Sequence, residues 1–153
     1  MPSDEIRVRI GSDADLVSAR AEARALALTL GFSRTDATLI ATAISEIARN
    51  IVVHAREGEI AMTARYEDER YGLIVVARDA GPGIRDVTGV LQNGSPTRGG
   101  LGLGLPGARR LMDEFGIESE PGDGTTVTMI KWRRRDELER LRDRRGQKGT
   151  ERA

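Results

Sequence analysis

A carboxylate opens a glycine-containing loop in the segment "RDAGPGI", where it could recognise a ligand. Asp79 follows the apolar run "LIVVA", which places it at the end of an expected buried strand. Gly81 and Gly83 would let the backbone approach a ligand closely, and the carboxylate could accept a hydrogen bond from an amino group such as that of adenine. The alternative is an ordinary turn with aspartate as its first residue, which the pattern Asp-x-Gly-x-Gly alone barely distinguishes.

A second segment, "GGLGLGLPGARRLM" at residues 99–112, combines several glycines with the start of an expected helix. Glycines ahead of a helix leave backbone N–H groups free to point at an anion, and the helix dipole adds partial positive charge there. The segment is therefore a candidate phosphate-binding loop. It lacks the GxxxxGK[ST] pattern of a P-loop, and no βαβ unit surrounds it as a dinucleotide-binding fingerprint would require. A flexible lid or a site of close helix–sheet packing is the alternative.

Two polar residues four positions apart, Glu46 and Asn50 in "SEIARN", lie on one face of an expected helix. They border the apolar stripe of Ile44, Ile47 and Ile51. Taken alone, this pattern is typical of a solvent-facing glutamate with an incidental asparagine. It gains meaning only together with the two glycine-containing segments.

Hydrophobic periodicity predicts the elements that must position these residues. Two helices, over about residues 14–32 and 35–54, follow a strand at residues 5–10. Asp13 or Asp15 would cap the first helix, and Gly31 would end it. After a break at Gly58, the pattern predicts strands at 59–67 and 71–79 joined by the turn "EDER", a loop from Gly81 onward, a helix at 105–115 stopped by Gly116, and strands at 117–120 and 125–132.

This order predicts a two-layer α+β sandwich, in which helices cover one face of a mixed sheet. The 153 residues suffice for one domain, and with only 3% aromatic residues its core must be aliphatic. With no cysteine, disulfides, thiolate catalysis and thiolate metal sites are excluded, and a single histidine argues against histidine-rich metal chemistry. No apolar run approaches the roughly 18 residues of a membrane span, and the first ten residues lack a signal-peptide segment, so we expect a cytoplasmic protein with no membrane partner.

Charge divides the chain into two parts whose formal charges cancel. Residues 133–153 hold nine Lys and Arg against five Asp and Glu, a net charge of +4, and the rest of the chain carries −4. A nucleic-acid footprint across the whole domain is therefore not expected. We expect residues 133–153 to form a charged tail that is helical to about Arg145 and disordered after it.

In sequence order, Glu-x-x-x-Asn on a helix, Asp-x-Gly-x-Gly after a strand, "GLGL" before a helix and "GTT" at residues 124–126 form a set more specific than any of its parts. This set resembles the Bergerat-fold (GHKL) ATP-binding superfamily, shared by gyrase B, the Hsp90 chaperones, sensor histidine kinases and MutL. The segments "TAISEIARNIVVHA", "ARDAGPGI" and "GGLGLGLPGARRLMDEF" are most similar to the RsbT-type serine/threonine switch kinases of the stressosome. The resemblance runs from about Glu5 to Trp132 and implies a kinase domain over residues 1–132, with the tail outside it.

The resemblance implies roles for individual residues in binding ATP and Mg²⁺. Asn50 would coordinate the Mg²⁺ that bridges the ATP phosphates, and Glu46 would act as general base toward a serine or threonine hydroxyl. Asp79 would bind the adenine amino group, with Gly83 shaping the pocket floor and Thr125 supporting Asp79 directly or through water. The other nucleotide-binding residues that the family implies are Gly81, Gly100, Leu101, Gly102, Leu103, Gly104 and Leu105.

Three further residues have weaker assignments. Arg49 and Arg98 are candidate phosphate contacts, although a solvated arginine is the commoner role for either. His54 is interpreted as structural, because no residue at catalytic spacing pairs with it.

The resemblance implies an ATP-dependent protein serine/threonine kinase of a partner-switching stress pathway. Its substrates would be STAS-domain proteins (RsbS/RsbR-like), and it would then activate a PP2C-type phosphatase (RsbU-like). Two alternatives use the same nucleotide site: an anti-sigma factor that sequesters a sigma factor, and a phosphatase activator in which the nucleotide is only regulatory. The sequence leaves open whether the chain is a monomer or a homodimer.

Overall fold

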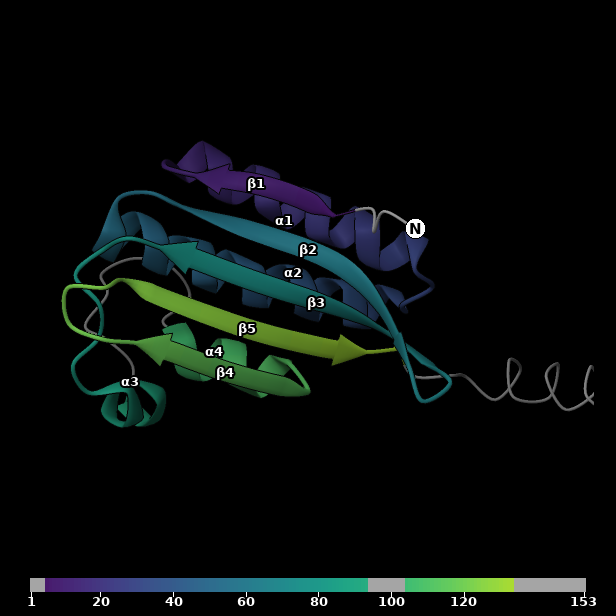
Figure 1. Cartoon of the computed structure of the whole chain (residues 1–153). Coiled ribbons are helices and arrows are strands. Elements are labelled where there is room, and N and C mark those ends of the chain that lie inside the picture. The colour runs from purple at the N-terminus through teal and green to yellow at the C-terminus, as the bar shows by residue number, and fades with distance from the viewer. Residues whose placement is uncertain (1–4, 94–103, 134–153) are drawn as a thin grey trace, which may run out of the picture.

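A five-stranded sheet forms one layer of the molecule (Figure 1). The computed structural model describes residues 5–93 and 104–133. The strand order across the sheet is β1-β2-β3-β5-β4, and each of these neighbouring pairs is antiparallel. The strands are β1 (Ile6–Ile10), β2 (Gly58–Glu67), β3 (Arg70–Asp79), β4 (Glu114–Ser119) and β5 (Thr125–Trp132).

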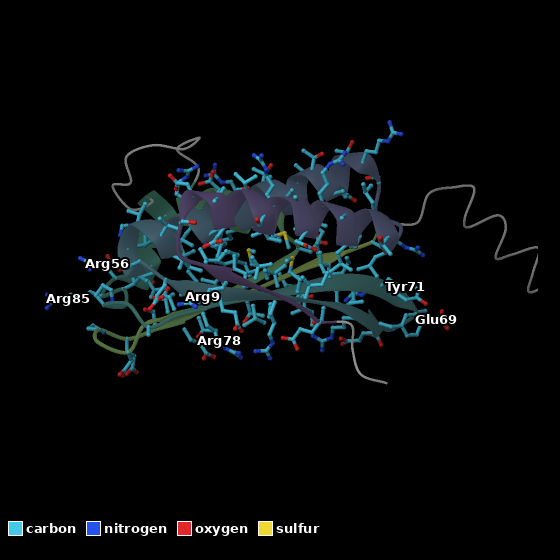
Figure 2. All side chains as sticks on the ribbon, turned by 90° about the horizontal axis from the view of Figure 1, so that it is seen from above. Arg9, Arg56, Glu69, Tyr71, Arg78 and Arg85 are labelled. Atoms are coloured by element: carbon cyan, nitrogen blue, oxygen red, sulfur yellow. The ribbon has the colours of Figure 1, made fainter. Side chains whose placement is uncertain are left out.

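The helices form the second layer, on one face of the sheet (Figures 1 and 2). The helices α1 (Asp13–Thr29), α2 (Arg34–Asn50) and α4 (Gly104–Leu111) cover that face. The short helix α3 (Val87–Asn93) lies at the end of the sheet where β3 stops, inside a segment predicted to be loop. The predicted two-layer α+β sandwich is confirmed.

The prediction of a mixed sheet is wrong, because the four strand pairings are all antiparallel. A single crossover helix returns the chain to the starting end of the sheet, so the next strand runs parallel to the first. Two consecutive helices connect β1 to β2, and the second helix reverses the chain again, so β1 and β2 run in opposite directions. β3 and β4 do run in the same direction, but β5 lies between them.

The core is aliphatic, as predicted from the composition. Alternate residues of the strands point toward the helices, and Ile60, Met62, Leu73, Val75 and Met129 are fully buried between the layers. The helices face the same core with the buried residues Leu16, Ala19, Ala23, Ala27, Ile40, Ile44 and Ile47.

The two ends of α1 differ in how well the sequence predicted them. Ser12 caps the start, since its Oγ accepts a hydrogen bond from Asp15 N at 3.3 Å, so the prediction of Asp13 or Asp15 as the cap is wrong. The Asp15 carboxylate instead accepts from Gly11 N at 2.8 Å. The predicted end at Gly31 is confirmed, because its φ of +89° provides the left-handed turn that stops the helix.

Beyond α2 the chain continues in a wider π-helical turn, η1 (Ile51–Ala55), and reverses at Arg56, whose φ is +72°. The predicted break at Gly58 is therefore two residues too late. Gly58 begins β2, where a Cβ atom would lie 2.5 Å from the Arg78 carbonyl oxygen and 2.9 Å from the Ile51 side chain. Close packing rather than a turn requires glycine there.

The predicted helix over residues 105–115 ends earlier than expected, at Leu111. Glu114, Phe115 and Gly116 belong to β4, so Gly116 does not stop the helix. The buried Lys131 ammonium donates to the Leu111 carbonyl oxygen at 2.9 Å and so satisfies the C-terminal end of α4. This cap comes from β5, twenty residues along the chain, and local sequence could not indicate it.

Among residues 5–93 and 104–133, no helix is both long enough and apolar enough to cross a membrane. The predicted tail helix to Arg145 lies outside these residues, and so does the disordered end predicted to follow it.

Candidate nucleotide-binding site

A cavity of about 230 Å³ is lined by residues of both the helical layer and the sheet. Its walls come from α2, η1, the end of β3 and the loop after it, α3, α4 and the first residues of β5. Figure 1 shows the end of the sheet at which β3 stops and β5 begins. Most of the lining side chains are apolar, and the polar ones are few. The lining residues are Ile47, Asn50, Ile51, His54, Ala55, Ala77, Asp79, Pro82, Gly83, Ile84, Val90, Leu105, Thr125 and Val127.

Asp79 faces this cavity from the last position of β3. Its Oδ1 accepts a hydrogen bond from Gly81 N at 2.9 Å, which fixes the carboxylate against the start of the loop. The other carboxylate oxygen remains to accept a hydrogen bond from a ligand. The carboxylate predicted from "RDAGPGI" to lie at a strand end does lie there, and it lines the cavity.

The two glycines after Asp79 serve the backbone in different ways. Gly83 lines the cavity with a φ of +79°, and a Cβ atom there would overlap the carbonyl group of Glu120. Gly81 does not line the cavity; a Cβ atom there would lie 2.6 Å from the Ala55 side chain. Gly81 therefore allows the loop to pack on η1, whereas Gly83 forms part of the cavity wall.

Asn50 reaches the cavity from the last turn of α2. Its Nδ2 is buried and has no hydrogen-bond partner among the described residues. A buried amide N–H without a partner is costly, and a hydrogen-bond acceptor bound in the cavity would satisfy it.

Glu46 lies one helical turn before Asn50 and is only 5% exposed, so it is not the solvent-facing glutamate that the pattern alone would suggest. Its Oε2 accepts a hydrogen bond from Gly104 N at 3.0 Å, at the N-terminus of α4. It does not belong to the cavity lining. The carboxylate therefore joins α2 to α4, which lies within the glycine-rich segment, 58 residues later in the chain.

The glycine-rich segment is described only from Gly104 onward. Gly104 has a φ of +55°, and Leu105 is buried and lines the cavity as an apolar wall. The predicted phosphate-binding residues Gly100, Leu101, Gly102 and Leu103, and the candidate phosphate contact Arg98, lie outside the described residues. Arg49, the other candidate, is half-buried and does not line the cavity.

Thr125 opens β5, directly opposite Asp79 in the register of the two strands. Its hydroxyl lies 2.9 Å from Ser119 Oγ on β4. Ser119 Oγ also accepts from Ile84 N at 2.8 Å and lies 3.0 Å from the Gly124 carbonyl oxygen. Ser119 was not singled out from the sequence, because a serine in a short strand carries no local signal of such contacts.

His54 also lines the cavity, although the sequence led us to interpret it as structural. The sequence did contain a signal that His54 could face the site, because Glu46, Asn50 and His54 follow one another at intervals of four residues. The apolar liners Ile84 and Val90 come from a segment in which no core element was predicted.

The arrangement suits a flat, largely apolar ring that carries an amino group. Apolar side chains line most of the cavity, and the Asp79 carboxylate and the Thr125 hydroxyl lie on one side of it. For a Mg²⁺ ion, Asn50 offers an amide oxygen, and the described residues contain no cluster of three His, Cys, Asp or Glu side chains that could hold a metal. A Mg²⁺ ion bound beside Asn50 would therefore take its other ligands from phosphate groups and water, as this ion commonly does.

Comparisons with known proteins agree with this geometry. The family model described as "Histidine kinase-like ATPase domain" matches residues 11–131. Serine/threonine-protein kinase RsbT of Bacillus subtilis is 46% identical over 132 residues, which cover 86% of this chain and 99% of that protein. An anti-sigma F factor of Caldanaerobacter subterraneus is 37% identical over 99 residues, covering 61% of this chain and 68% of that protein.

Solved structures show the same fold at lower identity. The crystal structure of the RsbU and RsbW domains of a Mycobacterium tuberculosis protein matches with a TM-score of 0.60 and 21% identity. This chain covers 34% of that structure, and 88% of this chain is matched. The mycobacterial sensor histidine kinase MprB matches with a TM-score of 0.50 and 14% identity, over 88% of this chain and 99% of that one.

These findings confirm the resemblance inferred from the motifs, and they confirm the predicted class of a serine/threonine-protein kinase with an ATPase-like domain. The matched residues include all of the cavity's walls. The chain belongs to the histidine kinase-like ATPase domain family and, within it, to the group of serine/threonine-protein kinase RsbT.

Proposed function

We propose that this protein transfers the γ-phosphoryl group of Mg-ATP to a serine or threonine hydroxyl of a STAS-domain partner, and that it then activates a PP2C-type phosphatase. The observation that carries the proposal is the cavity, where Asp79, Asn50 and the start of α4 meet. The likeness to kinase RsbT over almost its entire length supports the reaction class.

In this proposal the nucleobase occupies the cavity and its amino group donates to the free oxygen of Asp79. Leu105, Ile51 and Val127 pack against the ring and exclude water from it. The Asn50 side-chain oxygen would hold Mg²⁺, which when bound neutralises charge on the phosphates. The start of α4 would face the phosphates, where the helix dipole favours negative charge; its donors there would be the N–H groups of Leu105 and Gly107, because Gly104 N donates to Glu46 and Pro106 has no N–H.

Glu46 is the proposed general base. Its Oε2 is held by Gly104 N at 3.0 Å, which leaves Oε1 to accept the proton of the substrate hydroxyl as that oxygen attacks the γ-phosphorus. ADP leaves with the electrons of the broken phosphorus–oxygen bond, and the phosphorylated partner is released. The same hydrogen bond sets the distance between the base and the start of α4, so the base is positioned relative to the phosphates.

A phosphotransfer assay tests the proposal. Purified protein, Mg-ATP labelled at the γ-phosphate and a STAS-domain protein should give a labelled STAS protein. Glu46→Gln should lower the transfer rate by about 100-fold or more and keep ADP affinity, because the amide oxygen still accepts from Gly104 N but binds no proton. Glu22→Gln, at an exposed position on α1, is the matched control and should leave the rate unchanged. Unchanged transfer by Glu46→Gln would exclude this residue as the base.

A second candidate function is nucleotide-dependent capture of a sigma factor, which the 37% identity to an anti-sigma F factor favours. A pull-down with purified sigma factors in the presence of ADP or ATP separates the two. Stoichiometric, nucleotide-dependent capture without phosphotransfer to any STAS-domain protein would replace the kinase proposal.

A further inference from the structure

Ser119 is the centre of a hydrogen-bond group that joins three segments of the cavity wall. Its Oγ accepts from Ile84 N at 2.8 Å, lies 3.0 Å from the Gly124 carbonyl oxygen and lies 2.9 Å from Thr125 Oγ1. Ile84 belongs to the loop after Asp79, Ser119 to β4 and Thr125 to β5. One side chain therefore holds together three segments that surround the proposed base-binding end of the cavity.

The protons in this group can be counted. A serine hydroxyl has one proton to donate and two lone pairs with which to accept. Gly124 is a buried residue, and the Ser119 hydroxyl donates its proton to the Gly124 carbonyl oxygen at 3.0 Å. The contact between Ser119 and Thr125 must then be made with the proton of Thr125. In this arrangement both lone pairs of Ser119 and its single proton are used.

The position of the Thr125 proton limits what this hydroxyl can offer to a ligand in the cavity. Once the Thr125 proton points at Ser119, the Thr125 hydroxyl can present only lone pairs to a ligand. Thr125 and Asp79 are paired in the register of β3 and β5 and both line the cavity. The two side chains then form a pair of hydrogen-bond acceptors on neighbouring strands.

We propose that Ser119 is a positioning residue that fixes the Thr125 hydroxyl as an acceptor toward the cavity, and that the site thereby selects a purine with an amino group at C6 over one with a carbonyl there. The inference rests on the proposed nucleotide site. Without the Ser119 hydroxyl, Thr125 could rotate and donate its proton to a C6 carbonyl, and part of the discrimination would be lost. Asp79 would retain the remainder.

Affinities for ADP and IDP, measured by isothermal titration with Mg²⁺, test the inference, because the two nucleotides differ at C6. The measured quantity is the ratio of the IDP and ADP dissociation constants. Ser119→Ala should lower this ratio by about five- to tenfold, as expected for one hydrogen bond. Ser119→Thr, which restores a hydroxyl, should return the ratio toward that of the unaltered protein. Thr128→Ala, an exposed threonine on the same strand as Thr125, is the matched control and should leave the ratio unchanged.

A double-mutant cycle sharpens the assignment. Thr125→Val should itself lower the ratio, and adding Ser119→Ala to it should lower the ratio no further, because Ser119 acts through Thr125. If Ser119→Ala weakens ADP and IDP binding by the same factor, its role is only structural and the inference is wrong. Should Ser119→Ala fail to fold, Ser119→Cys takes its place, and a folded Ser119→Cys with an unchanged ratio also overturns the inference. If the unaltered protein binds neither nucleotide, the proposed function itself fails, which is a different result.

Discussion

The two ends of the same sheet are built in opposite ways. At the cavity end, β3, β5 and the loop after Asp79 are held by glycines with positive φ and by single hydrogen bonds around Ser119. At the other end, the β2–β3 hairpin and the end of β5 are held by large side chains. Figure 2 shows Tyr71 and Glu69 at that end, with Arg56 and Arg85 at the opposite one.

The far end contains Trp132 and both tyrosines of the chain. Trp132 Nε1 donates to Glu114 at 2.6 Å, the Arg70 guanidinium lies 3.8 Å from the centre of the tryptophan ring, and the Tyr66 and Tyr71 rings are 4.8 Å apart. Packing stabilises this end, whereas the cavity end gives up side-chain contacts to leave space for a ligand. Stabilisation by large side chains and binding of a ligand are therefore separated along the strands of this domain.

The largest effect that this comparison predicts is at the far end. Trp132→Ala should lower the free energy of unfolding by about 3–5 kcal/mol, because it removes a buried ring that packs on Gly72. Denaturant unfolding measures the loss, and ADP affinity of the protein that remains folded should stay the same. Trp132→Phe, which keeps a ring, should lose less. If fully folded Trp132→Ala bound ADP much more weakly than the unaltered protein, the two ends of the sheet would be coupled.

At the cavity end, Gly83→Ala should lower the free energy of unfolding by about 2–4 kcal/mol and also abolish ADP binding. The added Cβ would overlap the Glu120 carbonyl at a φ that non-glycine residues rarely adopt. Thermal unfolding and titration with ADP check both effects. Gly116→Ala is the matched control, since nothing lies within 4 Å of its added Cβ, and it should leave both quantities nearly unchanged. If Gly83→Ala bound ADP as tightly as the unaltered protein, Gly83 would not form part of the wall of the ADP site.

A third change should affect binding and spare stability. Asp79→Asn should weaken ADP binding by about 10- to 100-fold, because a charged acceptor is replaced by a neutral amide. Its effect on unfolding should be small, since the amide oxygen of the new side chain can still accept from Gly81 N. Titration with ADP is the measurement, and Asp123→Asn, in the exposed turn before β5, is the control. If Asp79→Asn and Asp123→Asn lost the same amount of ADP affinity, Asp79 would not be the residue that binds the base.

The smallest expected effect is at the most exposed aromatic residue. Tyr66→Ala should cost about 0.5–1 kcal/mol, because the residue is 63% exposed and loses mainly the contact with Tyr71. Denaturant unfolding of Tyr66→Ala and Tyr66→Phe together checks this, and the phenylalanine variant should be nearly unchanged. A loss as large as that for Trp132→Ala would show that the tyrosine pair is part of the core.

Local sequence patterns were enough to predict the local features of this protein. Alternation and helical spacing predicted the strand pairs and the two long helices, and a carboxylate at a strand end with Gly83 beyond it marked the cavity. The ordered motifs also indicated the family, which the comparisons confirmed. These features depend on residues close together in the chain, where steric limits and periodicity act directly.

Contacts between residues far apart in the chain depend on how the two layers pack, and local sequence does not indicate them. The bond from Gly104 to Glu46 spans 58 residues, and the bond from Ile84 to Ser119 spans 35. Packing of the two layers also places β5 between β3 and β4, brings Lys131 to the end of α4 and places His54 in the cavity wall. Hydrogen bonds of this kind have no periodic signature, because their partners are chosen by how the two layers pack and not by the neighbours of either residue.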